Sequence, residues 1–131
     1  NSYGGVCYDY LAWASVVERL MDRGYTIKTH VQGVAMSCGV MQTITGTKGH
    51  RTMSRHSYIM CHSISSGTYG SHQTMIEDIE HTNEIWNKFK DIIKKYTKIT
   101  DEQIEDVKKR KYDWYIDAPT ALRLGCIDKI V

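Results

Sequence analysis

The sequence predicts an α/β protein built from βαβ crossovers, with one helix that protrudes from the rest. Two observations support this fold class. Short strand-like segments alternate with helical segments along the chain, and this alternation favours a parallel core with helices packed on it. In addition, the apolar residues of Gln73–Tyr96 follow a helical period over a stretch much longer than the other predicted helices.

The first half of the chain is predicted to alternate between helices and strands. The expected elements are a helix over Tyr8–Arg23, a strand over Thr26–Val31, a helix over Cys38–Thr45, and strands over Arg51–Met53 and Ser57–His62. In the first helix, apolar residues recur every three or four positions, and Gly24 follows as a stop signal. The strands are short runs with β-branched residues, and Gly46 and Gly49 bracket a turn.

The second half is predicted to be mostly helical. Its expected elements are a helix over Gln73–Tyr96, a helix from Thr100 to Lys109, a helix capped by Asp117 and stopped by Gly125, and a closing strand over Ile127–Val131. Ile79, Trp86 and Ile93 lie heptads apart in the first of these helices, which would extend roughly 35 Å at 1.5 Å per residue. We expect it to protrude, although a helix lying across the sheet would show the same pattern. Thr100 and Gln103 form a capping-box pair.

Composition indicates a single globular domain over residues 1–131. The chain is 41% hydrophobic and 24% charged, close to the average of ordinary domains, and no linker or repeat divides it. A net charge of +2 without a basic face argues against nucleic-acid binding, and charged residues interrupt every apolar run, which argues against a membrane span. The first residues lack signal-peptide features, so we expect a cytoplasmic protein, with an organelle as the alternative.

The cysteines and the loops predict no bound cofactor or metal. The four cysteines lie far apart, with no Cys-x-x-Cys spacing for a zinc site or a redox pair, and we expect reduced thiols. The sequence also contains no nucleotide-binding loop. Any use of ATP would therefore belong to a partner.

Ser37 is the first candidate for chemistry. It ends the Gly-x-Ala-x-Ser run of Gly33–Ser37, where small residues surround the start of a predicted helix. Such a junction exposes the hydroxyl and leaves backbone N–H groups unpaired, which suits a nucleophile. A serine here would also fit a plain helix N-cap.

Two further features accompany this serine. His62 ends a predicted strand, and in a parallel α/β sheet the carboxyl ends of the strands face the ligand crevice. Gly4 and Gly5 precede the first helix and would let a backbone N–H approach a developing oxyanion. A single histidine also fits a structural role, and a Gly pair also fits a turn.

Taken in order, these segments resemble the proteolytic subunit of the Clp protease over nearly the whole chain. The matching segments are Asn1–Gly5 (Asn-Ser-Pro-Gly-Gly in the family), Gly33–Gly39 (Gly-Gln-Ala-Ala-Ser-Met-Gly), Gly46–Arg51 (Gly-x-Lys-Gly-x-Arg), Ile59–His62 (Met-Ile-His) and Asp117–Asp128 (Ser-Ala-x-x-Ala through Gly-Leu-Val-Asp). Five ordered matches are far more specific than any one of them. Tyr3, Val34, Met36 and Ser63–Ile64 depart from the family pattern, and the family's amino-terminal part is absent, so we expect an N-terminally incomplete chain.

The resemblance implies a spiral of βαβ units and a serine-peptidase site. Ser37 would be the nucleophile, His62 the general base, and the backbone N–H groups of Gly5 and Cys38 the oxyanion donors. The family's third triad member aligns with Asp113. Because the segment before Ala118 is about two residues longer than usual in the family, Asp106 and Asp117 remain alternatives, with Asp117 also suited to cap a helix.

The resemblance also implies partners and an assembly. The substrate would be an unfolded polypeptide, bound by strand addition along Ser63–Gly70. The long helix would match the family's handle, which joins two seven-membered rings of identical subunits around a chamber fed by an AAA+ Clp ATPase. Three alternatives remain: a non-catalytic ring subunit, a crotonase-type acyl-CoA enzyme that shares the spiral architecture, and a Ser–Lys dyad using Lys48.

Overall fold

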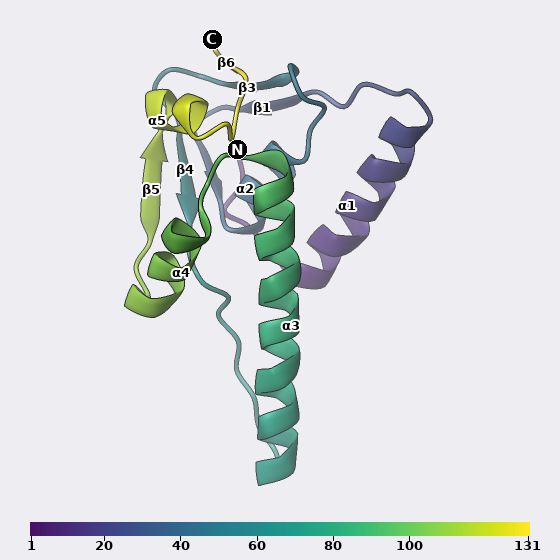
Figure 1. The fold of residues 1–131 in the computed structure, drawn as a ribbon, viewed down its shortest axis with the longest axis vertical. Helices are drawn as coiled ribbons and strands as arrows, with labels where there is room; N and C mark the ends of the chain where they lie inside the picture. The colour runs from purple at the N-terminus through teal and green to yellow at the C-terminus, as the bar shows by residue number, and fades with distance from the viewer.

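Two small three-stranded sheets form the centre of the molecule in the computed structural model, which describes residues 1–131 (Figure 1). One sheet has the order β1-β3-β6 and is parallel throughout. The other has the order β2-β4-β5, in which β4 pairs parallel with β2 and antiparallel with β5. The strands are β1 Thr29–Val31, β2 Val34–Met36, β3 Arg51–Met53, β4 Tyr58–Cys61, β5 Trp114–Asp117 and β6 Lys129–Ile130.

This arrangement is a mixed α/β fold, but the expected parallel core is divided between two sheets, and one strand pair, β4–β5, is antiparallel. Between β1 and β2 the chain passes from one sheet to the other at Gly33. The φ of Gly33 is +85°, a value that glycine adopts at little energetic cost. The buried Ser57 hydroxyl accepts from the Gly33 amide at 2.9 Å and donates to the Val31 carbonyl at 3.3 Å, so it satisfies backbone groups where the two sheets separate. The predicted strand over Thr26–Val31 is wrong in its first half, because only Thr29–Val31 pairs with β3.

Two helices complete the core, α1 Cys7–Asp22 and α2 Cys38–Ile44, each within a residue or so of the predicted bounds. The helix α2 packs on β1, β2 and β4, and α1 packs on α2. Tyr10, Ala14 and Val17 form the buried face of α1, as the three- and four-residue spacing predicts. Nearly every residue of α2 is buried, which makes it the central helix of a single core cluster of 20 residues.

The helix α3, His72–Tyr96, extends well beyond the body of the molecule (Figure 1). Its buried residues are Ile85, Trp86 and Phe89. Ile79, which belongs to the same heptad stripe, is 58% exposed, so the stripe is covered only toward the C-terminal half of the helix. The segment before α3 runs back along its outer half, and a Thr68–Asp78 hydrogen bond joins the two.

The C-terminal elements follow the local capping signals. The helix α4, Asp101–Arg110, begins with the complete Thr100–Gln103 capping box, and α5, Ala118–Arg123, begins with Asp117 accepting from the Thr120 amide at 2.9 Å. In contrast, β5 was not predicted, since its four residues become a strand only by pairing with β4. No helix of the structure is both long enough and apolar enough to span a membrane.

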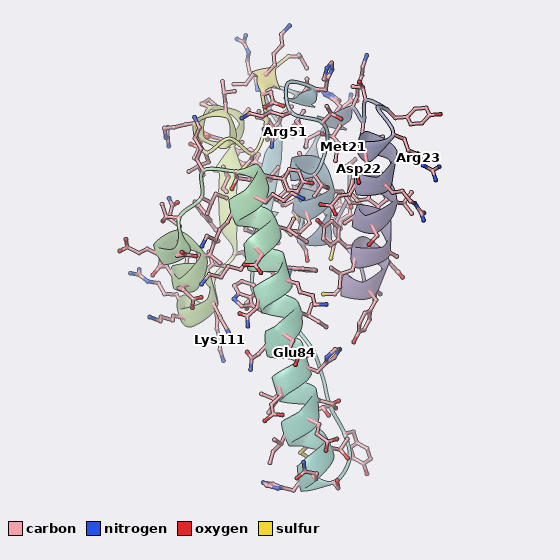
Figure 2. The ribbon with its side chains drawn as sticks, turned by 45° about the vertical axis from the view of Figure 1, so that its right-hand side comes forward. Met21, Asp22, Arg23, Arg51, Glu84 and Lys111 are labelled. Atoms are coloured by element: carbon pink, nitrogen blue, oxygen red, sulfur yellow. The ribbon has the colours of Figure 1, made fainter.

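A buried ion pair ties several elements together. The Arg51 guanidinium donates to the Asp128 carboxylate at 2.6 and 2.9 Å, and to the carbonyls of Ile44 and Tyr96 at 3.2 and 2.8 Å. Arg51 therefore connects β3 to the segment before β6 and to the C-terminal ends of α2 and α3. Figure 2 shows Arg51 beside the upper end of α3, with Glu84 farther down the same helix.

Candidate active site

Ser37 lies at a sharp turn between β2 and α2. Its backbone has φ 54° and ψ −123°, a region that residues other than glycine rarely adopt. The Ser37 amide donates to the Met60 carbonyl at 2.9 Å, which continues the β2–β4 pairing up to the serine. The hydroxyl makes no N-cap hydrogen bond to the helix that follows. A strained serine at a strand-to-helix turn is the geometry of a nucleophile elbow rather than of a plain cap.

The first residues of the chain pack against this turn. Ser2 bridges Ala35 in parallel, with its amide donating to the Val34 carbonyl at 2.8 Å and its carbonyl accepting from the Met36 amide at 2.9 Å. The chain then passes Ser37 at Gly4, which has φ +99°. A Cβ at Gly4 would lie 2.8 Å from the Ser37 Cβ and 3.3 Å from its Oγ, so only glycine fits against the serine.

Two free backbone amides flank Ser37. Neither the Gly5 amide nor the Cys38 amide donates a hydrogen bond within the chain, the latter because it opens α2. The Cys38 thiol donates to the Gly5 carbonyl at 3.4 Å, which joins the two residues across the turn. Free N–H groups on both sides of a serine hydroxyl can stabilise a negative oxygen.

His62 directly follows β4 and is half-buried. It lines the same cavity as Ser37. Among the histidines, hydrogen bonds to side chains are made by His30 and His81, and His62 makes none. The structure thus brings the serine and the histidine to one cavity without a hydrogen bond between them, as is common in sites without substrate.

The three candidate acids occupy different positions. Asp113 is exposed and directly precedes β5, and continuing the Cys61↔Trp114 register by one residue sets Asp113 opposite His62. Asp117 caps α5, and hydrogen bonds from Thr120 lower the pKa of its carboxyl. Asp106 pairs with Arg110 at 2.7 Å. Asp113 forms no hydrogen bond to His62 here, but it is the one acid of the three that the strand register sets beside the histidine.

Lys48, the base of the alternative dyad, lies in the exposed turn after α2. Ser37 lies at the opposite end of that helix, which spans about 10 Å at 1.5 Å per residue. Lys48 is also not among the residues that line the cavity of Ser37. His62 is therefore the better placed base.

The cavity has a volume of about 290 Å³ and is mainly apolar. Trp86, Phe89 and Ile93 of α3 form part of one wall, and Ile104 and Val107 of α4 form another part. The apolar stripe of α3 was recognised in the sequence as a packing face, and its role in lining the site was missed. Cys7, Cys61 and Trp114 also line the cavity, and nothing in their local sequence signalled this.

A serine at a strand-to-helix elbow and a histidine at the end of the neighbouring strand, sharing one cavity of an α/β fold, are typical of peptidase-type hydrolases. The chain belongs to the Clp protease family, whose model matches residues 1–131.

Curated relatives agree with this assignment. The chain is 29% identical over all of its 131 residues to the ATP-dependent Clp protease proteolytic subunit of Porphyromonas gingivalis, and 27% identical over the same length to that of Deinococcus radiodurans. It spans 57% and 62% of the lengths of these two relatives.

Proposed function

We propose that this chain carries the active site of a serine endopeptidase that cleaves unfolded polypeptides. Ser37 is the nucleophile, His62 the general base, Asp113 the acid that orients His62, and the amides of Gly5 and Cys38 form the oxyanion hole. The observation that carries the proposal is the positive-φ backbone of Ser37, beside a cavity that it shares with His62.

The reaction would proceed by acyl transfer. His62 takes the proton of the Ser37 hydroxyl as the serine oxygen attacks a peptide carbonyl carbon, and the carbonyl oxygen becomes an oxyanion bound by the two amides. The imidazolium then gives its proton to the leaving amine, and water hydrolyses the acyl-enzyme by the same steps. Asp113 accepts a hydrogen bond from the imidazole and so fixes its tautomer. This requires His62 to close its hydrogen bonds to Ser37 and Asp113 when substrate binds.

The mainly apolar cavity beside Ser37 favours substrates that carry an apolar side chain next to the cleaved bond. Its walls come from α3 and α4, with Ile64 of the segment before α3 completing them. The flanking segment Ser63–Gly70 has no regular structure and is free to pair with an extended peptide. Main-chain pairing would make cleavage tolerant of sequence.

The assembly is proposed as two stacked heptameric rings of this subunit, fed by an AAA+ Clp ATPase. This rests on the family, on the names of the relatives, and on the outer half of α3, whose apolar residues face solvent in the single chain. The proposed handle would bury them against a second ring.

Active-site labelling tests the triad. A fluorophosphonate is expected to label the full-length protein at Ser37, and labelling should be lost in Ser37→Ala and fall by about 10³-fold or more in His62→Ala, because the imidazole activates the serine. Asp113→Asn should slow labelling nearly as much. Matched controls are Ser15→Ala, His56→Ala and Asp91→Asn, all exposed and outside the cavity.

Two outcomes would contradict the proposal in different ways. Normal labelling in Asp113→Asn together with a loss in Asp106→Asn or Asp117→Asn would move the acid and keep the nucleophile. A folded, assembled protein that never labels at Ser37 would instead indicate a structural ring subunit.

A further inference from the structure

Three of the four cysteines gather around Ser37. Cys7 and Cys61 line its cavity, and Cys38 follows it in the chain. Cys126 is fully buried and does not line the cavity. The proposed mechanism uses the backbone of Cys38 and none of the thiols.

Cys7 and Cys38 form a pair across the turn that holds the serine. Cys7 is the first residue of α1 and Cys38 is the first residue of α2. The Cys38 thiol donates to the carbonyl of Gly5, two residues before Cys7, at 3.4 Å. Burial raises the pKa of the Cys38 thiol, and the neighbouring Cys7 thiol raises it further. The hydrogen bond to Gly5 therefore holds the Cys38 sulfur against the segment that leads directly into Cys7.

The two members of the pair differ in access. Cys7 is half-buried and faces the cavity, whereas Cys38 is 5% exposed. A small oxidant that enters the cavity would meet Cys7 first. Cys38, which is buried and does not line the cavity, would react second, the usual arrangement of a sensing and a resolving cysteine.

We propose that Cys7 and Cys38 are a modification site for a peroxide, and that the disulfide they form inactivates the site around Ser37. The second half of this statement rests on the proposed peptidase function. The Cys7 thiolate attacks one oxygen of hydrogen peroxide, the O–O bond breaks, and the released hydroxide takes up a proton to leave as water. The Cys38 sulfur then attacks the Cys7 sulfenic acid, the S–S bond forms as the S–O bond breaks, and the sulfenic hydroxyl takes up the Cys38 proton to leave as a second water.

The disulfide would act on the oxyanion hole. Once bonded to Cys7, the Cys38 sulfur can no longer donate to the Gly5 carbonyl, so the contact that joins the two amide-bearing residues is lost. The start of α2 is also drawn toward the start of α1. Displacing a single oxyanion donor slows acyl transfer by about 10²- to 10³-fold.

Mass mapping of the full-length protein tests the site itself. The protein is reduced, treated with hydrogen peroxide, blocked with N-ethylmaleimide and digested. We expect one cross-linked peptide pair that joins Cys7 to Cys38, and its mass should be lower by two hydrogens than the sum of the two thiol peptides. Separate sulfinic acids without a cross-link, or a cross-link between Cys61 and Cys126, would overturn the inference.

Labelling by a fluorophosphonate tests the consequence. Peroxide should slow labelling of Ser37 by at least tenfold, in step with the cross-link, and reduction should restore it. Cys7→Ser should form no cross-link, and peroxide should not change its labelling rate relative to the same variant without peroxide. Cys7→Ala serves as a second variant should Cys7→Ser fail to fold. Cys126→Ala should keep both the cross-link and the sensitivity.

The two readouts separate this inference from the proposed function. A reduced protein that does not label at Ser37 would contradict the peptidase mechanism, while the mass of the Cys7–Cys38 peptide pair would still report the thiol site. A cross-link that forms without slowing the labelling would overturn the inactivation.

Discussion

Ser37 sits in a backbone conformation that costs a residue other than glycine roughly 1–3 kcal/mol. Its neighbours maintain that conformation. The Ser37 amide bonds to the end of β4, and Gly4 packs against its side chain without a Cβ. The orientation of the hydroxyl therefore depends on the first residues of the chain as much as on the elbow itself.

Gly4→Ala is predicted to disable Ser37 more than it destabilises the fold. The new Cβ would lie 2.8 Å from the Ser37 Cβ, and alanine would also be strained at φ +99°. Since a displacement of about 1 Å at a reacting group can slow a reaction about 10²-fold, we expect fluorophosphonate labelling to fall by that order. Gly5→Ala meets open space and should label faster than Gly4→Ala, so equal rates in the two variants would argue against the contact.

At the scale of elements, local signals predicted the helices better than the strands. The Thr100–Gln103 capping box, the Asp117 cap and the apolar spacing of α1 all lie within a few neighbouring residues, and each is found as expected. The strands β2 and β5 are only three and four residues long, and their partners are distant in the sequence. Pairing of that kind depends on tertiary structure, so periodicity did not reveal it.

The candidate site, like the fold, could be predicted from the sequence only in part. Strand ends in the sequence suggested that Ser37 and His62 would approach each other, and the structure gives them one cavity. The position of Asp113 opposite His62 depends on the antiparallel register of β4 and β5, which no local pattern encodes. For that reason Asp106, Asp113 and Asp117 could not be separated before the strand pairing was known.

The Arg51–Asp128 pair leads to a prediction about pH. Hydrogen bonds from Arg51 lower the pKa of Asp128 to about 2, whereas an unfolded aspartate titrates at about 3.9. Because the folded-state pKa is the lower one, the stabilisation is complete above about pH 4 and is lost as the pH falls toward 2. It amounts to on the order of 2 kcal/mol.

Urea unfolding of wild type and Asp128→Asn at several pH values measures this effect. The difference in the free energy of unfolding should shrink as the pH falls from about 5 to about 2.5. A difference that stays constant over this interval would contradict the lowered pKa. Asp91→Asn, at an exposed position of α3, should change stability at neutral pH by no more than about 0.5 kcal/mol.

At the scale of the whole molecule, the outer half of α3 carries an apolar stripe that the rest of the chain leaves partly exposed. Met75, Ile76 and Ile79 follow the spacing of one helical face and are 38%, 37% and 58% exposed. The body of the molecule does not reach the outer end of α3 (Figure 1). A contact between subunits is the proposed use of this face.

Ile79→Glu is therefore predicted to weaken the association of rings and leave each protomer folded. A carboxylate at the centre of an apolar contact must lose its hydration without gaining a partner, which is unfavourable. Sedimentation of the full-length protein should show a smaller particle than wild type, with an unchanged far-UV spectrum. Glu80→Gln changes the neighbouring exposed position and should sediment like wild type, whereas an unchanged particle for Ile79→Glu would place this face outside the interface.

The length of α3 beyond the core has a consequence for how the molecule reaches its final form. A helical stretch shorter than about 15 residues is marginal in water unless something packs against it. In the proposed assembly, the outer turns of α3 would gain stability from the surface that meets Met75, Ile76 and Ile79. Dilution of such an assembly would then loosen the outer turns before it disturbed the two sheets, and for this part of the chain the last step of folding would be an encounter between molecules.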